Sequence, residues 1–355
     1  MKKIPLYILI ALNLLTVAAM LITAFQGRMS PERFGLLSVT GHAFPLFLLL
    51  TVAFMAVWVF IKKRFIIISS LGLIAAYAPV TLYCPINTAN EKPAKDTTML
   101  VMSYNTCGWG HGKAMPGRKY TNAELREYID SVDADIVSLQ ESYVGKTMKK
   151  LLQRKYEYVD TAKFIEGTLT LLSRYPILKK ELVVNHKGSG AAAFWTLIGS
   201  REVIIINAHL ISVGISMNER RNFSSIMHGE EDNSDTVRAT SLSISRKIII
   251  RNTQRAREAE QVAQFIRLHK GTPIIVTGDF NDHPLSYTHH TISQGLTDCY
   301  EATAFGPGYT FRHFSIRSRI DNILCTKDIE PYYCHVDDTV RLSDHQPMMC
   351  YFRKL

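Results

Sequence analysis

The sequence predicts a membrane protein in which three transmembrane helices precede one soluble α/β domain. Its composition changes sharply near residue 97: long uncharged segments lie before this point, and short apolar runs alternate with amphipathic stretches after it. Such an alternation of strand-like and helix-like stretches is typical of α/β folds. We therefore expect a membrane domain over residues 1–87, a linker over residues 88–98 and a single soluble domain over residues 99–355.

Three segments without a charged residue are long enough to cross a bilayer. They cover residues 5–25, 43–61 and 65–86, and a spanning helix needs roughly 17 to 25 apolar residues. A cleaved signal peptide is the alternative for the first segment, but its apolar core is too long and no convincing small-residue cleavage site follows. Buried core helices are the alternative for the other two, and their length and lack of charge favour membrane spans.

Basic residues in the short loops predict the orientation of these spans. Lys2 and Lys3 precede the first span, and Lys62, Lys63 and Arg64 lie between the second and the third. Cytoplasmic loops are the ones enriched in Lys and Arg. We therefore expect a cytoplasmic N-terminus and an extracytoplasmic location for everything after the third span.

The net charge of +10 mostly reflects the membrane domain. Nine of the 41 Lys and Arg residues but only three of the 31 acidic residues lie within residues 1–97, which leaves +4 for the soluble part. This excess is poor evidence for a nucleic-acid partner. The six cysteines lack Cys-x-x-Cys spacing, so neither a zinc site nor a redox motif is predicted.

Eight short apolar runs predict the strands of the soluble domain. They cover residues 99–105, 135–142, 168–173, 191–198, 202–210, 273–280, 319–325 and 347–352. Helical periodicity marks residues 122–132 and 255–269. Arg255 in the second of these helices is about as consistent with a solvated charge as with a site, so we assign it no role. The polar stretch 212–244 is expected to form a long surface excursion, with part of it helical as an alternative.

Polar residues of catalytic type stand where these strands end. In the stretch "IIVTGDFNDHP", residues 274–284, a buried-strand pattern stops at Asp279 and Asn281. Alone, this pattern fits an Asx turn as well as a site, because Asp and Asn favour turns. The other strand ends, however, add residues of the same kind, which indicates one polar site on a rigid frame. These residues are Asn105, Glu141, His209, Asp321, Asp344 and His345.

The residue types in this set fit metal-assisted hydrolysis of a phosphoester. Asn105 and Glu141 offer the hard oxygen ligands that suit Mg²⁺, an ion that keeps waters and binds substrate phosphate. Asp279 can position and deprotonate an attacking water. His345, held protonated by Asp321, can donate to phosphoryl oxygens.

Seven segments together resemble a known superfamily. In chain order, "SYN", "LQES", "TLTLLSRYPI", "NAHL", "GDFND", "SRIDNIL" and "SDHQPM" resemble the endonuclease/exonuclease/phosphatase superfamily over about residues 98–355. The resemblance implies the DNase I-like fold, an α/β architecture of four layers with a two-sheet β-sandwich flanked by helices. It also implies that Asn105 and Glu141 hold a divalent ion, with Asp344 near it. Mg²⁺ is the expected ion, with Mn²⁺ or Ca²⁺ as alternatives.

The same resemblance assigns roles to the other candidates. It implies that Asp279 and Asn281 handle the nucleophilic water and that His209 contacts the scissile phosphate. It implies further that Asp321 orients His345. We therefore expect a membrane-anchored, metal-dependent phosphoesterase.

At four positions this chain differs from the motifs of two subfamilies of the superfamily, and these differences reduce the number of substrate classes to consider. Cys107 and His209 stand where relatives that cut at abasic sites have an acid and a tyrosine, and Arg319 and Ile320 stand where inositol polyphosphate 5-phosphatases have a tryptophan-cysteine pair. Two phosphodiester substrates remain: a lipid head group, as in sphingomyelinase-like enzymes, or extracytoplasmic DNA or RNA. A non-catalytic membrane binding platform is the third hypothesis, and its sign, the loss of a site residue, is absent from the sequence.

Overall fold

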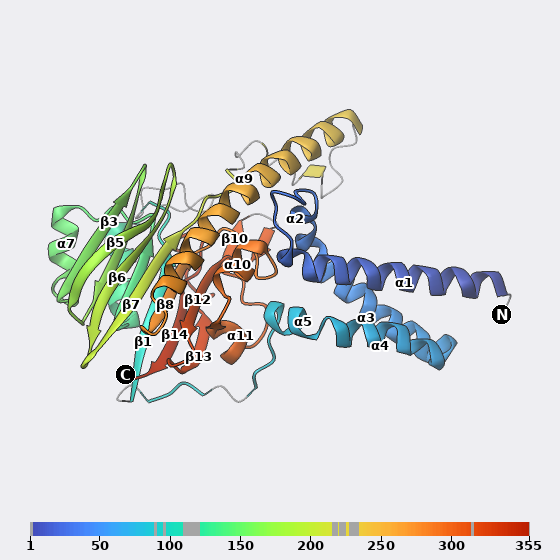
Figure 1. Cartoon of the computed structure of the whole chain (residues 1–355), viewed down its shortest axis with the longest axis horizontal. Coiled ribbons are helices and arrows are strands. Elements are labelled where there is room, and N and C mark those ends of the chain that lie inside the picture. The colour runs from blue at the N-terminus through green and yellow to red at the C-terminus, as the bar shows by residue number, and fades with distance from the viewer. Residues whose placement is uncertain are drawn as a thin grey trace.

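The computed structural model shows an elongated molecule in which N-terminal helices project from a larger part that contains the strands (Figure 1). The structure describes residues 3–88, 91–94, 97–108, 121–214, 219, 225–226, 234–313 and 316–354.

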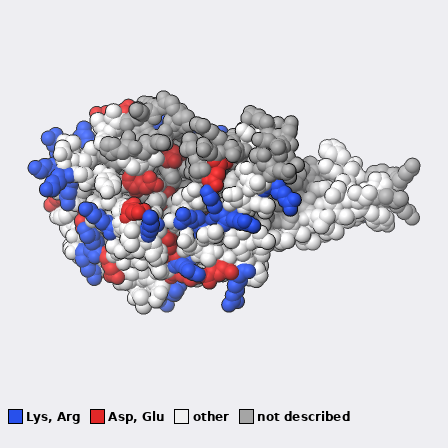
Figure 2. Space-filling view, turned by 90° about the horizontal axis from the view of Figure 1, so that it is seen from above, with Lys and Arg blue, Asp and Glu red and all other residues white. Residues whose placement is uncertain are grey.

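The projecting helices correspond to the predicted membrane spans. Two of them, over Pro5–Arg28 and Leu37–Ile61, are long and apolar enough to cross a membrane. They contain α1 (Lys3–Phe25), η1 (Gln26–Arg28), α2 (Leu37–Thr40), η2 (Gly41–Ala43) and α3 (Phe44–Ile61). Figure 2 shows this projection as a surface almost free of Lys, Arg, Asp and Glu among the described residues.

The third predicted span is broken into two helices. Residues Lys63–Ala75, which comprise η3 (Lys63–Phe65) and α4 (Ile66–Ala75), meet α5 (Tyr77–Tyr83) at an angle of 63°. Pro79 lies in the first turn of α5 and has no N–H to donate to the carbonyl of Ala75. A helix loses a bond and bends at such a position. The pair counts as a third span if the two pieces are taken together.

The larger part is built on two six-stranded sheets. The first has the order β13, β14, β1, β2, β4, β3, and the second has the order β5, β6, β7, β8, β12, β9. The first sheet contains β1 (Thr98–Asn105), β2 (Ile136–Gln140), β3 (Tyr158–Phe164), β4 (Gly167–Ser173), β13 (Pro331–Val336) and β14 (Met348–Arg353). The second contains β5 (Ile177–His186), β6 (Ser189–Ile198), β7 (Arg201–His209), β8 (Ile274–Asp279), β9 (Leu296–Asp298) and β12 (Asp321–Thr326). A hairpin of β10 (Phe311–His313) and β11 (Ile316–Ser318) stands apart.

Three hydrophobic cores stack these sheets and their helices into four layers. One core joins the inner faces of both sheets, for example through Val101 and Phe194. A second packs the first sheet on α6 (Asn122–Val132) and α7 (Lys146–Leu152), and a third packs the second sheet on α9 (Ser234–Leu268) and α10 (Tyr287–Ile292). A short α11 (Cys299–Thr303) packs on β12 and β13. This is the four-layer α/β sandwich that the sequence predicts.

One predicted helix is longer than expected, and several elements were not predicted. The unpredicted elements are α7, α10, α11, β3, β5, β9, β10, β11 and β13. Helix α9 begins at Ser234, far upstream of the predicted start at residue 255. Its N-terminal half is rich in Ser, Thr and Arg and lacks a continuous apolar stripe, which is the signal that hydrophobic periodicity detects. It therefore occupies part of the predicted 212–244 excursion; residues 215–218, 220–224 and 227–233 of that excursion lie outside the described part.

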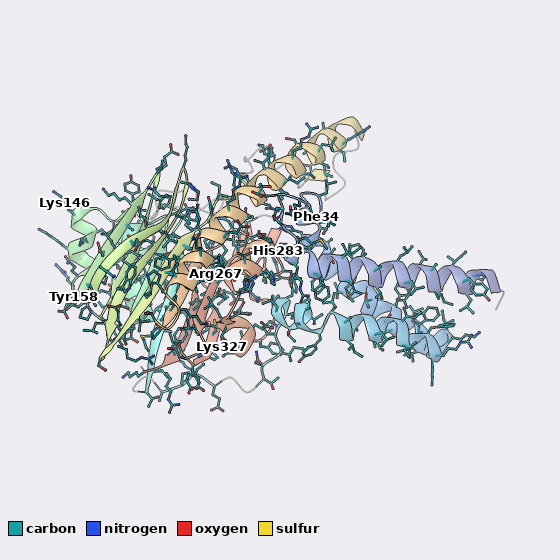
Figure 3. All side chains as sticks on the ribbon, viewed as in Figure 1. Phe34, Lys146, Tyr158, Arg267, His283 and Lys327 are labelled. Atoms are coloured by element: carbon teal, nitrogen blue, oxygen red, sulfur yellow. The ribbon has the colours of Figure 1, made fainter. Side chains whose placement is uncertain are left out.

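The part that contains the two sheets is packed directly on the ends of the apolar N-terminal helices. Gln26 Nε2 donates to the carbonyl of Leu285 at 2.8 Å, and Asn252 Nδ2 donates to the carbonyl of Ser38 at 3.1 Å. Figure 3 labels His283 at this junction. The two parts are thus joined by side-chain contacts as well as by the linker.

Candidate active site

The strand order brings the predicted site residues to one edge of the sandwich. Strands β1 and β2 run parallel in one sheet, and β7 and β8 run parallel in the other. Asn105, His209 and Asp279 are the last residues of β1, β7 and β8, and Glu141 follows β2 directly. Because parallel strands end at the same edge, these four side chains meet there.

Asp279 is the centre of this cluster. Its Oδ2 atom accepts hydrogen bonds from Asn105 Nδ2 at 3.0 Å and Asn281 Nδ2 at 3.2 Å. The same oxygen lies 3.7 Å from His345 Nε2 and 3.8 Å from His209 Nε2. Asp279 is 1% exposed, so this carboxylate is surrounded by protein groups on most sides.

A glycine allows β8 to bring Asp279 this close to β7. Gly278 has φ +138°, and a Cβ atom there would overlap the backbone carbonyl of Ala208. Only glycine adopts this conformation without strain. The backbone geometry therefore requires glycine at position 278, directly before Asp279.

An ion pair between His345 and Asp321 lies against the same carboxylate. Asp321 begins β12 opposite Asp279, and its Oδ2 atom lies 2.9 Å from His345 Nδ1. Burial lowers the pKa of His345, but the carboxylates of Asp321 and Asp279 outweigh it and hold that pKa well above its ordinary value. Burial raises the pKa of Asp279, and His345 opposes that shift without cancelling it.

These three residues also satisfy the distance requirement for a metal cluster. One ligand atom from each of Asp279, Asp321 and His345 lies within 4.8 Å of the others. A metal ligand nitrogen must, however, be unprotonated, whereas the raised pKa of His345 keeps a proton on both ring nitrogens near neutral pH. The arrangement therefore fits proton handling better than metal binding.

Glu141 is the most accessible carboxylate of the site. Its side chain is 41% exposed, and its Oε1 atom lies 3.2 Å from Asn105 Nδ2 and 3.4 Å from His209 Nε2. Its backbone is left-handed, with φ 49°, and Thr106 Oγ1 donates to its carbonyl at 3.1 Å. This strained turn points an oxygen donor out of the end of β2, which suits a divalent cation.

Of the other two predicted metal ligands, Asn105 contacts Glu141, and Asp344 is linked to Asn105 through Ser343. Asn105 turns its amide nitrogen toward Glu141, while its oxygen accepts from the N–H of Cys107 at 3.0 Å. The Asp344 carboxylate lies 3.4 Å from Ser343 Oγ, which donates to the carbonyl of Asn105 at 2.8 Å. The donor set of one open carboxylate, one amide and one neighbouring carboxylate fits a hard divalent ion.

Two buried polar residues that the prediction did not assign support the floor of the site. Gln140 Nε2 donates to Asn207 Oδ1 at 2.7 Å, and Asn207 Nδ2 donates to the carbonyls of Leu139 at 3.1 Å and Thr170 at 3.2 Å. This network crosses between the sheets just below Glu141 and His209. Its signal was present in "LQES" and "NAHL", where a polar residue interrupts an apolar strand.

Arg255 supports the loop that follows Asp279. Its side chain is buried, and Nη1 lies 3.0 Å from Asp282 Oδ2, so it is not a solvated charge. Arg255 Nε also donates to the carbonyl of Ile211 at 2.9 Å, and Thr288 Oγ1 donates to Asp282 at 2.9 Å. Burial alone would raise the pKa of Asp282, but Arg255 together with His283, His42 and the hydrogen bond from Thr288 outweighs it and holds the pKa low.

Solved structures with the same architecture include the human Nocturnin catalytic domain with bound sulfate anion. It is 17% identical, with a TM-score of 0.50, and the match covers 74% of this chain and 96% of that one. D. rerio TDP2 complexed with single strand DNA product is 16% identical, with a TM-score of 0.48 and coverage of 72% and 99%. The Bacteroides thetaiotaomicron mannosyl-6-phosphatase is 18% identical, with a TM-score of 0.47 and coverage of 72% and 99%.

Two family models match the sequence, although no curated protein does. Residues 6–83 match a model described as Domain of unknown function (DUF8431). Residues 102–345 match the model of the Endonuclease/Exonuclease/phosphatase family, which covers well over half of the chain and every predicted site residue. The chain therefore belongs to the endonuclease/exonuclease/phosphatase family of phosphoester hydrolases, as its motifs predict.

Proposed function

We propose that the protein is a membrane-anchored, metal-dependent phosphodiesterase whose water is activated by Asp279. One observation carries this proposal. The buried carboxylate of Asp279 lies within 3.8 Å of four polar side chains, those of Asn105, Asn281, His209 and His345. Such a convergence of an acid, two amides and two imidazoles is what general-base hydrolysis needs.

Asp279 takes the proton of the attacking water. Its raised pKa makes it a stronger base than an ordinary carboxylate, because a base works best when its pKa approaches the working pH. Asn281 bonds both oxygens of Asp279, through its backbone N–H at 2.8 Å and its side chain at 3.2 Å. In our proposal Asn281 fixes the carboxylate and presents the water to the phosphorus.

The two histidines hold the substrate phosphate. His345, kept cationic by Asp321, donates through Nε2 to a phosphoryl oxygen as negative charge develops there. His209 contacts the same phosphate from β7, on the side of Glu141. Asp321 acts through His345 as a positioning residue.

A divalent ion completes this set in our proposal. Asn105, Glu141 and Asp344 would hold it, with Mg²⁺ as the first choice and Mn²⁺ or Ca²⁺ as alternatives. When bound, such an ion neutralises charge on a phosphoryl oxygen and orients the substrate.

A lipid head group is the substrate class that we favour. The catalytic part is packed on the membrane helices through buried contacts such as Gln26 to Leu285 and Asn252 to Ser38. This packing would hold the site at a fixed distance from the bilayer. An enzyme for dissolved nucleic acid would need only a tether.

The proposed orientation has a cytoplasmic N-terminus and an extracytoplasmic site. An alkaline phosphatase fusion after residue 97 tests it, because that reporter is active only outside the cytoplasm. We expect an active fusion, and an inactive one would reverse the topology.

A substrate panel tests the activity itself. The full chain in lipid nanodiscs is assayed with Mg²⁺ and with EDTA on sphingomyelin and phosphatidylinositol vesicles, plasmid DNA, RNA and a generic phosphodiester. We expect EDTA-sensitive cleavage of a lipid. EDTA-sensitive cleavage of DNA or RNA alone would replace the lipid substrate by nucleic acid, and metal-independent or absent turnover on every substrate would contradict the proposal.

A further inference from the structure

The N-terminal half of α9 extends beyond the catalytic part on the side of the membrane helices (Figure 1). Residues 237–257 of this helix contain six Arg or Lys and no acidic residue. Three of these cations pair with acids from other segments: Lys247 with Glu219, Arg255 with Asp282 and Arg257 with Glu32. Arg238 and Arg246 are exposed, as are the apolar side chains of Leu242, at 50%, and Ile250, at 58%. A basic helix with exposed aliphatic side chains is typical of the membrane surface.

One face of this helix already touches the membrane part. Ile249 packs so close to Gly35 that a Cβ atom on that glycine would lie 2.7 Å from the Ile249 side chain. Asn252, on the adjoining turn, donates to Ser38. Residues seven apart lie on the same face of a helix, so Leu242 lies on the face of Ile249, two turns beyond the contact.

The loop between α1 and α3 continues this surface. Phe34 is 48% exposed and Leu36 is 77% exposed, although both lie in a segment that packs on α9. Figure 3 labels Phe34 in the angle between α9 and α1. Exposed apolar side chains at the end of a membrane span are placed where a bilayer surface would cover them.

We propose that Phe34, Leu36, Leu242 and Ile250, with Arg238 and Arg246, form a membrane-facing surface that rests on the outer leaflet. The apolar side chains enter the head-group region, and the two guanidinium groups bind anionic lipid phosphates. This inference rests on the proposed membrane anchoring, because the surface meets lipid only if α1 and α3 span the bilayer.

The consequence for the active site follows from the length of α9. The same helix carries the membrane-facing surface in its N-terminal half and Arg255, which holds Asp282, further along. One rigid element would therefore set the height and tilt of the site above the bilayer. A site held in this way is suited to head groups of the leaflet that carries it.

Nitroxide labels in nanodiscs that contain anionic lipid test the proposal on the full chain. Leu242→Cys is labelled in a Cys84→Ser, Cys107→Ser background, and its collisions with oxygen and with a water-soluble nickel complex are measured. Leu268→Cys is the matched control, since Leu268 is an exposed leucine, at 75%, at the other end of α9. Leu15→Cys, on α1, reports the membrane anchoring itself.

We expect the label at position 242 to collide severalfold more with oxygen and severalfold less with nickel than the label at 268. Equal nickel collisions at 242 and 268, with a lipid-exposed label at 15, would overturn the membrane-facing surface and leave the anchoring intact. A water-exposed label at 15 would overturn both. Protection of 242 from both reagents would indicate coverage by protein, such as a second copy of the chain, and would also overturn the proposal.

Discussion

Acid should weaken the packing of the catalytic part on the membrane helices, because His283 is buried there in its neutral form. His283 is 4% exposed, its Nε2 atom lies 3.4 Å from Gln26 Nε2, and its ring meets that of His42 edge to face with centres 4.7 Å apart. Burial lowers the pKa of His283 from 6.5 to about 3, and His42 acts in the same direction while Asp282 opposes it.

The direction and size of the effect follow from this pKa. Because the pKa is lower in the folded state, the unfolded chain binds a proton that the folded chain excludes. The stability linked to neutral His283 is therefore complete above pH 6.5 and is lost as the pH falls toward 3. Between pH 7.5 and pH 5 the loss is about 2 kcal/mol. For a domain of this size that lowers the melting temperature by roughly 4 to 8 °C.

The assay is thermal unfolding of the full chain in nanodiscs at pH 7.5 and pH 5, for wild type and His283→Gln. Glutamine keeps a polar side chain but does not titrate, so the variant should lose roughly 4 to 8 °C less than wild type on acidification. Equal acid responses in wild type and His283→Gln would refute the reasoning.

Three further predictions concern the site and its support. Arg255→Met should lower the unfolding free energy by about 3 to 5 kcal/mol, because it leaves the buried carboxylate of Asp282 unpaired, and Asp282→Asn in the same chain should restore part of it in denaturant titrations. Gly278→Ala should prevent stable folding, seen as lost expression or an early melt, whereas Gly145→Ala, with nothing within 4 Å, should be neutral. Glu141→Gln should raise the Mg²⁺ concentration for half-maximal activity severalfold at unchanged melting temperature, and an unchanged metal requirement would remove Glu141 from the metal ligands.

The inner strands of both sheets could be predicted from the sequence, and the edge strands could not. All eight predicted strands are present, and each has a neighbouring strand on both sides. Six strands were missed: β3, β5, β9 and β13 are the four edges of the two large sheets, and β10 and β11 form the separate two-stranded sheet. Edge strands carry charged and polar residues that prevent association with other chains; in β5, "ILKKELVVNH", these residues hide the apolar run that marks a buried strand.

The site could be predicted as a set of residues but not as a set of contacts. The motifs placed Asp279 and Asn105 at strand ends and His345 just before the last strand. Parallel pairing explains why the two ends meet, and the antiparallel pairing of β14 with β1 brings His345 to the same edge. The pairing of Arg255 with Asp282 joins positions 27 residues apart through the turn after β8, a turn that the sequence does not define. The left-handed backbone of Glu141 is equally hidden, because nothing in "LQES" distinguishes a strained turn from a strand that continues.

In the proposed mechanism, Asp279 activates water in a metal-dependent phosphodiesterase. The most direct test is turnover of a generic phosphodiester by the full chain with Mg²⁺, comparing wild type, Asp279→Asn and the control Asp328→Asn, whose side chain is 46% exposed. Loss of a general base predicts a fall in kcat of about 10² to 10⁴ for Asp279→Asn. Asp328→Asn should match wild type. Near wild-type turnover by a folded Asp279→Asn variant would contradict the account.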